Sequence, residues 1–186
     1  MCYTKTASGR CMRASAGCRN LFYQNHCRIP CGIHSVFSNT FIFDAENDGK
    51  EGYLYSLVTT SIIQGIKSIP VYVEADVSDG MPLFEMVGSL SPEVKESKER
   101  VRTALKNTGY ILPPKRITIN FIPANIRKTG SGFDLPVVAA VLCAIGIVPE
   151  EALKDTMVVG EISLSGDVKP VNGILPMVAE AKERGV

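Results

Sequence analysis

The chain has 186 residues, of which 45% are hydrophobic and 21% charged, and its formal net charge is +1. This composition is typical of a folded globular protein, and it excludes both a strongly basic nucleic-acid binder and a chain disordered throughout. No apolar run reaches the roughly 20 residues of a membrane helix, because the longest run, residues 135–148, is interrupted by Pro136 and Gly146. We therefore expect a cytoplasmic protein with no membrane partner.

The first 52 residues differ in composition from the rest. Five of the six cysteines lie in the first 31 residues, and the first 34 residues carry five Lys or Arg and no acid. A zinc site could use His26, Cys27, Cys31 and His34, but the cysteines lack the two tight ligand pairs typical of zinc modules. No signal-peptide core supports a disulfide framework, and no amphipathic periodicity supports a transit peptide. We predict that residues 1–52 are disordered or are a non-native upstream extension, and that residues 53–186 form the folded domain.

Strands come first in that domain. Residues 56–63 and 69–76 are rich in β-branched residues, and the second run alternates apolar and polar side chains as a half-buried strand does. Because Gly65 lies near the break between them, we predict a hairpin. A turn at residues 78–82 and a short strand at residues 83–87 follow.

A helix is predicted from Ser91 and Pro92 to Gly109. Serine can accept bonds from the amides of a first helical turn, proline is tolerated at the first helical position, and glycine commonly ends a helix. Glu96 and Arg100 have the i,i+4 spacing of a surface ion pair. The dense charges of this segment indicate a solvated helix face rather than a binding site.

The remaining elements alternate between strands and helices. We predict a strand at residues 116–122, a buried helix at 134–145, a strand at 157–164, a turn at 165–167 and a helix at 174–184. Strands followed by this alternation indicate a single α/β sandwich with a mixed sheet. Gly185 is a typical residue after a helix end, and a further strand is expected beyond it, so we expect the domain to be truncated at its C-terminus.

The glycine-containing loop at residues 128–134 is a candidate site, because it joins a strand to a helix N-terminus. It matches neither the phosphate loop nor the dinucleotide fingerprint. As a nucleophile, Ser131 would need a base, and Lys169 is the nearest lysine by strand order. The alternative, which we favour, is structural: Gly130 and Gly132 permit a tight turn, and Asp134 caps the helix.

Two further groups of charged residues carry weaker signals. Asp76 and Asp79 lack the additional oxygen ligands of a calcium loop, so we predict no metal site. Basic residues flank the strand at 116–122, and they are either contacts to DNA phosphates or merely basic strand ends. These residues are Lys115, Arg116, Arg127 and Lys128.

Several long segments resemble the N-terminal domain of the YifB/ComM family of Mg-chelatase-like AAA+ ATPases. They include Asp76-Val-Ser-Asp-Gly-Met-Pro at the turn, Lys128-Thr-Gly-Ser-Gly-Phe-Asp in the loop, and Gly160-Glu-Ile-Ser-Leu-Ser-Gly-Asp-Val-Lys-Pro. Residues 94–109, 112–120 and 173–176 also match. The resemblance covers residues 54–186 and none of residues 1–52.

The resemblance implies a fold similar to the Lon proteolytic domain and to domain 2 of ribosomal protein S5. It also implies that this ChlI-type domain is followed by an AAA+ module, absent from this chain, which would use ATP and Mg. Family members assemble as homo-hexamers in bacterial cytoplasm. The ComM branch resembles a branch-migration helicase that handles DNA in recombination and natural transformation, so DNA is an implied partner.

The chain departs from the Lon pattern at both residues of its Ser-Lys dyad. Lon-type peptidases use a serine in a Gly-Pro-Ser-Ala-Gly-like loop and a lysine after a Gly-Gly-Leu-like turn. The alignment places Gly132 at the serine position and Leu175 at the lysine position, and neither side chain can act as nucleophile or base. We therefore predict no catalytic residues, no cofactor and no enzyme activity for this chain. The alternatives are a Lon-type peptidase that uses Ser131 with Lys169, and an oligomerisation module without DNA contact.

Overall fold

A computed structural model describes residues 55–186, and the predictions for residues 1–52 lie outside this part of the chain. The fold begins with strands β1 (Tyr55–Gln64) and β2 (Lys67–Ser78), which pair antiparallel along their length. Gly65 and Ile66 form the two-residue turn, and the φ of Gly65 is +65°, which suits a tight hairpin connection. The predicted hairpin is confirmed, and both strands are longer than predicted.

The sheet is mixed, as predicted. Strand β3 (Leu83–Val87) pairs parallel to β4 (Arg116–Ile122), while β4 pairs antiparallel to β2. The strand order is β1-β2-β4-β3, so β2 and β4 are the inner strands. Parallel pairing of β3 and β4 requires a crossover between them, and helix α2 (Pro92–Asn107) supplies it.

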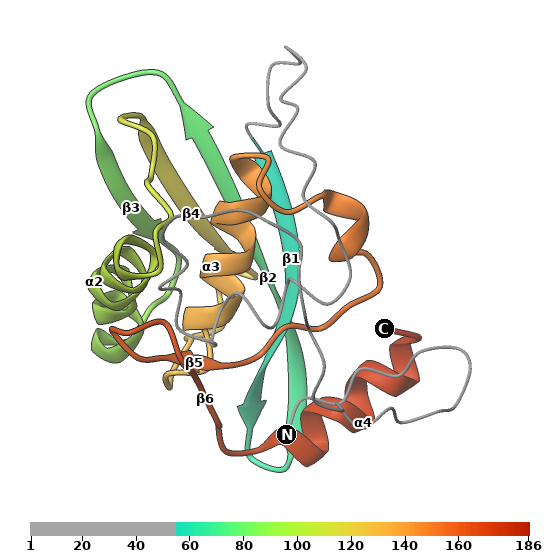
Figure 1. Cartoon of the computed structure of the whole chain (residues 1–186). Helices are drawn as coiled ribbons and strands as arrows, with labels where there is room; N and C mark the ends of the chain where they lie inside the picture. Colours follow the sequence, from blue (N-terminus) through green and yellow to red (C-terminus); the bar gives the residue numbers. More distant parts are fainter. Residues whose placement is uncertain (1–54) are drawn as a thin grey trace, which may run out of the picture.

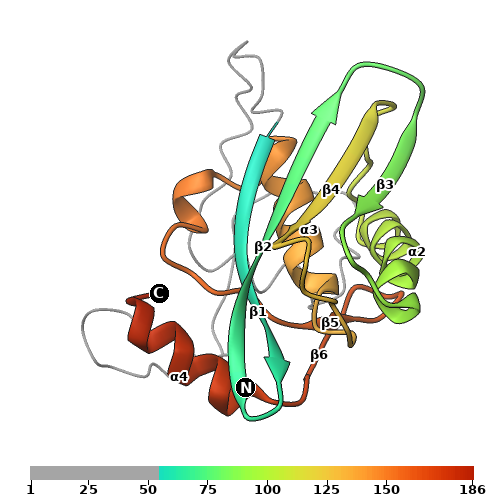
Figure 2. The ribbon, with the colours of Figure 1, turned by 180° about the vertical axis from the view of Figure 1, so that it is seen from behind.

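Helices α2 and α3 (Asp134–Ala144) cover one face of the sheet (Figure 1), and the view from behind shows the opposite face (Figure 2). All eleven residues of α3 are buried, because this helix packs on β1 and β2 and is covered by α2. A buried hydrogen bond also joins α3 to the sheet, since the Ser56 hydroxyl donates to the Ala140 carbonyl at 2.7 Å. Helix α4 (Ile174–Arg184) packs against β1 and β2.

The segment predicted as a strand at residues 157–164 forms much less sheet than expected. Met157 makes one isolated parallel bridge to Thr59 of β1, and only β5 (Glu161–Ile162) pairs with β6 (Val168–Lys169). Gly160 lies between them and bonds to the loop before α3 instead, donating to the Gly132 carbonyl at 3.1 Å and accepting from the Leu135 amide at 3.0 Å. A short 3-10 helix, η1 (Glu150–Ala152), was not predicted.

Within residues 55–186, no helix is long and apolar enough to cross a membrane.

Candidate functional site

The loop between β4 and α3 is anchored by backbone bonds to the segment that precedes α2. The Lys128 amide donates to the Ser89 carbonyl at 2.8 Å, and the Lys128 carbonyl accepts from the Ser91 amide at 2.9 Å. Gly130 follows with a φ of +88°, a conformation that side chains disfavour. Gly130 is therefore the turn glycine that the sequence predicted.

Lys128 is buried rather than exposed. Its side chain is 0% exposed, and its ammonium group donates to the carbonyls of Pro123 and Phe121, the latter at 3.4 Å. Burial lowers the pKa of this amine, because desolvation disfavours its charged form. This burial favours the second alternative, a basic strand end, because the ammonium group already donates to carbonyl oxygens at the end of β4.

The other three predicted basic residues do not form one patch. Lys115 and Arg116 lie at the start of β4, whereas Arg127 follows its far end, and a seven-residue strand is about 23 Å long. Lys115 pairs with Asp79 at 3.0 Å, and Arg116 pairs with Glu85 at 2.7 Å. All four side chains are accessible to solvent, and Asp79 is almost fully exposed, so each pair contributes little to stability and can exchange for other ions.

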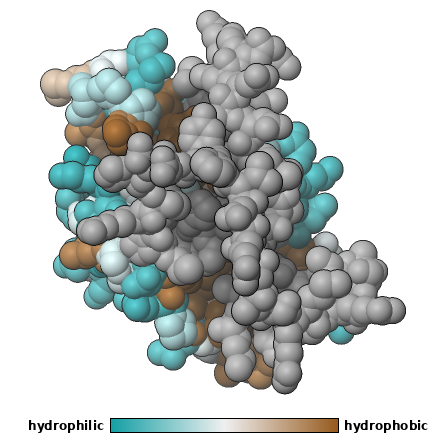
Figure 3. All heavy atoms as spheres, viewed as in Figure 1, coloured by the Kyte–Doolittle hydropathy of each residue, from teal (hydrophilic) through white to brown (hydrophobic). Residues whose placement is uncertain are grey.

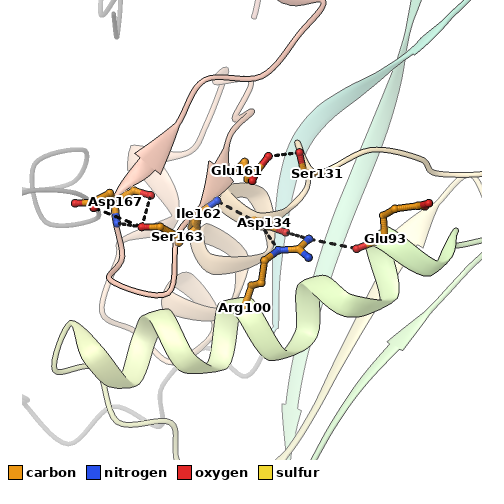
Figure 4. A network of polar contacts seen from close by, with 8 residues as sticks. All are labelled: Glu93, Arg100, Ser131, Asp134, Glu161, Ile162, Ser163 and Asp167. Carbon is orange, nitrogen blue, oxygen red and sulfur yellow. Dashed lines mark hydrogen bonds and ion pairs between the residues drawn. The ribbon is translucent and has the colours of Figure 1, made fainter.

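Ser131 is held by a carboxylate. Its hydroxyl donates to Glu161 of β5, and the two side chains point toward one another across the gap between loop and strand (Figure 4). Lys169 on β6 instead lies 3.8 Å from Asp167 and is about half exposed. The geometry therefore gives no support to a Ser131–Lys169 dyad, because the two side chains have different partners.

Asp134 forms a buried ion pair and does not cap the helix. Phe133 occupies the N-cap position of α3 without a side-chain cap bond, and Asp134 is the first helical residue. The Asp134 carboxylate is 0% exposed and accepts from Arg100 of α2 at 2.9 and 3.0 Å (Figure 4). It also accepts from the Ile162 amide of β5 at 3.3 Å. The cap prediction is wrong because a longer-range partner satisfies this carboxylate.

The guanidinium group of Arg100 bonds to Asp134 and to the main chain of its own helix. The hydrogen bond to Asp134 raises the pKa of its guanidinium, although partial burial opposes that shift. Its Nη2 nitrogen, which donates to Asp134, also donates to the main-chain carbonyl of Glu93 at 3.2 Å. In the described part of the chain Arg100 pairs with Asp134, not with Glu96 as its spacing suggested.

Gly132 lines a pocket of about 230 Å³ between the loop, β1 and the start of α4. A Cβ atom at this position would lie 3.6 Å from Val159 and 3.7 Å from Val171, which is ordinary van der Waals contact. Packing therefore leaves room for a small side chain at Gly132, the position to which the resemblance to Lon assigns the serine. Leu175 is 83% exposed and is not among the residues that line this pocket.

The pocket contains hydroxyl groups but no reactive pair among the residues that line it. Ser61 of β1 is 4% exposed, and its hydroxyl has no partner among the described residues. Thr129, Ser131 and Asn172 add polar groups at its rim. Residues 55–186 hold no cluster of three His, Cys, Asp or Glu side chains that could bind a metal ion.

The loop does not fit ATP or its Mg ion. Lys128 faces carbonyl oxygens, and Ser131 faces a carboxylate that would repel phosphate. The whole chain also lacks the Gly-Lys-Ser/Thr of a phosphate loop. We therefore do not assign nucleotide binding to the loop at residues 128–134.

Comparison with known proteins identifies the family. The model of "Subunit ChlI of Mg-chelatase" matches residues 73–186, which is more than half of the chain. The chain belongs to this Mg-chelatase-like family, together with YifB and ComM. The matched region extends from the middle of β2 through α4 and includes the loop at residues 128–134, whereas β1 and its pocket residue Ser61 lie before it.

The relatives are bacterial proteins and are much longer. The chain is 38% identical to the uncharacterized protein YifB of Escherichia coli (strain K12) over 130 residues, which are 70% of this chain and 26% of YifB. It is 35% identical to the competence protein ComM of Haemophilus influenzae over 128 residues, 69% of this chain and 25% of ComM. Lon protease 2 of Bacillus subtilis is 34% identical over 112 residues, 57% of this chain and 20% of that protease. The chain thus spans about a quarter of the YifB and ComM proteins.

Sequence reasoning missed two residues of this ChlI site, Arg100 and Glu161. Arg100 was assigned to a solvated helix face, and Glu161 to a strand without a role. The sequence shows only the residues that neighbour each of them in the chain. The partner of Arg100, Asp134, is 34 residues away, and the partner of Glu161, Ser131, is 30 residues away.

We predict opposite outcomes for two glycine substitutions at this site. Gly132→Ala is expected to change the free energy of unfolding by less than about 1 kcal/mol, because the added methyl group makes only ordinary contacts. Gly160→Ala is expected to cost about 1–3 kcal/mol, because its Cβ would lie 2.9 Å and 3.1 Å from atoms of Leu135. Urea denaturation of both variants tests this pair, and equal costs would contradict the packing described here.

We also predict that Arg100→Ala destabilises the fold by about 3 kcal/mol, because it leaves the buried Asp134 carboxylate unpaired. Arg102→Ala is the matched control on the same helix. Arg102 pairs with Glu99 at 3.6 Å on an exposed surface, so its loss is expected to cost less than about 1 kcal/mol. Arg100→Lys should fall between them. Thermal unfolding of the three variants measures the order, and an Arg102 effect as large as the Arg100 effect would contradict it.

Proposed function

We propose that residues 55–186 are the non-proteolytic Lon-like domain of a Mg-chelatase-like AAA+ ATPase. In this proposal the domain supports assembly of a homo-hexamer and handling of DNA by a branch-migration helicase used in recombination or natural transformation. The AAA+ module that would bind ATP and Mg is no part of residues 55–186.

One observation carries the non-proteolytic part of the proposal. Gly132 and Leu175 stand where the Lon pattern needs serine and lysine, and Leu175 is largely in solvent. The neighbouring hydroxyl of Ser131 donates to Glu161, so it has no amine to remove its proton. A hydroxyl becomes a nucleophile only when a base is within hydrogen-bond reach.

The assembly and DNA parts rest on family membership. ComM is named a competence protein, and the chain shares 35% identity with it over most of the described domain. Arg127 is exposed in the loop beyond β4, and no acidic side chain lies within ion-pair distance of it in the described part. Such a cation is available to a DNA phosphate.

A peptidase assay tests the first part. The chain is expected to show no turnover of short fluorogenic peptides, which need no ATP-driven unfolding, while Lon protease 2 serves as the active control. Gly132→Ser should remain inactive, because it restores a hydroxyl without a base. Cleavage that disappears in Ser131→Ala would instead establish the Ser131 peptidase.

A second prediction concerns oligomeric state. The complete gene product, with ATP and Mg, is expected to sediment as a hexamer in analytical ultracentrifugation. A monomer at all concentrations would contradict the proposal. A hexamer that binds no DNA would favour the alternative of a pure oligomerisation module.

A third prediction separates the two neighbouring cations of the loop. Arg127→Gln is expected to lower the salt dependence of DNA binding by about 0.7 in the log–log slope for a single strand, the contribution of one phosphate contact. Lys128→Met should leave that slope unchanged, because the Lys128 ammonium is buried against carbonyl oxygens. Fluorescence anisotropy over a salt series measures both. An equal loss in the two variants would place Lys128 at the DNA after all.

A further inference from the structure

A pocket of about 290 Å³ lies at the opposite end of β4 from the loop, between α2 and the starts of β3 and β4. Lys98 and Arg102 enter it from α2, and Lys115 enters from the segment that leads into β4. These are the charged residues that line it, and all three are basic. Phe84 and Pro113 are among the residues that form its apolar wall.

The three cations are available to a ligand. In the described part of the chain, Lys98 has no acidic side chain within 4.0 Å. Lys115 is paired with Asp79, which is 92% exposed, and Arg102 lies 3.6 Å from the exposed Glu99. Exposed pairs of this kind contribute at most about 1 kcal/mol, so an incoming anion with several oxygens can replace these acids.

A second, apolar pocket of about 420 Å³ adjoins the first. The two share the wall formed by Leu112, Pro113, Pro114 and Lys115. Beyond that wall, Ile111, Ile145 and Ile147 line the apolar side, and Ile111 is 88% exposed. Figure 3 has the orientation of Figure 1 and shows hydrophobic surface beside hydrophilic atoms in the region where β4 starts.

We propose that this paired site binds one nucleotide unit of a single-stranded nucleic acid, with its phosphate between Lys98, Arg102 and Lys115. The inference rests on the proposed function and locates its DNA contact. Arg102 can present two parallel donors to one phosphate, while the two lysines add charge. The adjoining apolar surface accepts the flat face of an unpaired base, which a duplex would keep stacked inside.

The site uses helix residues whose charge pattern alone indicates a solvated face. Lys98 and Arg102 are four residues apart and therefore project from the same side of α2. Their convergence with Lys115 depends on the crossover that places α2 beside the sheet. Four of the five residues at positions 98–102 are charged, so no local signal distinguishes the two that face the pocket.

Binding of a fluorescent oligothymidylate to the 186-residue chain tests the inference. The variant Lys98→Gln/Arg102→Gln/Lys115→Gln is expected to bind at least about tenfold more weakly at low salt, with a salt slope reduced by about 2. The control, Lys67→Gln/Lys154→Gln/Lys182→Gln, removes the same charge from exposed positions outside the pocket and should bind like the wild type. Thermal unfolding verifies that both triple variants fold. Inorganic pyrophosphate, polyglutamate and a blunt duplex are the competitors.

Each outcome has a distinct meaning. Loss of binding confined to the pocket variant, with single-stranded DNA the best competitor, supports the inference. Equal loss in both triple variants, or equal competition by polyglutamate, overturns it in favour of general charge attraction. Unchanged oligothymidylate binding with loss of pyrophosphate binding also overturns it, and shows a site for free phosphate. If the pocket variant binds oligothymidylate as strongly as the wild type, the inference is overturned. The proposal that the domain handles DNA is then unaffected, and the DNA contact lies elsewhere on the domain. If the wild type binds no DNA, both the inference and DNA contact by this domain fail, while the non-proteolytic and assembly proposals are unaffected.

Discussion

The buried carboxylate of Asp134 constrains the arrangement of the whole domain. A charge with no exposure to water is tolerated only when it is paired and hydrogen-bonded, and Asp134 receives two bonds from Arg100 and one from the Ile162 amide. These partners belong to α2 and β5, while Asp134 opens α3. One side chain therefore fixes how three elements meet. Its place at a helix N-terminus adds favourable interaction with the free amides there.

The hydrogen bonds of Asp134 also position the candidate site. Because Asp134 is bonded to both α2 and β5, the preceding loop lies next to β5, and Ser131 lies beside Glu161. Lys128 is directed inward at the other end of the same loop. The shape resembles a site that could present a reactive group, yet the side chains of Lys128, Ser131 and Asp134 already have structural partners. This is the physical basis for the proposal that the domain supports its parent protein and carries no reaction of its own.

Local patterns allowed much of the fold to be predicted. Alternation in residues 69–76, Pro92 at a helix start, and glycines at 109 and 185 report on neighbouring residues, and each element they indicated is present. The failures share a different origin. Lys128, Asp134 and Arg100 were each assigned by local statistics, but each is governed by a partner from another element. The strand at 157–164 was overestimated for the same reason, because Gly160 bonds to the distant Gly132 rather than to β1. The absence of the Ser-Lys dyad stays a prediction, and it depends only on the residue types at two aligned positions rather than on which side chains meet.

Strand β4 also fixes the distance between its two ends. It is an inner strand, bonded to β2 on one side and β3 on the other, so its two ends cannot move independently. Lys115 precedes it and Arg127 follows it, and its seven residues measure about 23 Å. In the proposed DNA complex, a single strand that contacts both Lys115 and Arg127 must span at least this length. Oligomers too short to span it can occupy one end of β4 or the other but cannot join them.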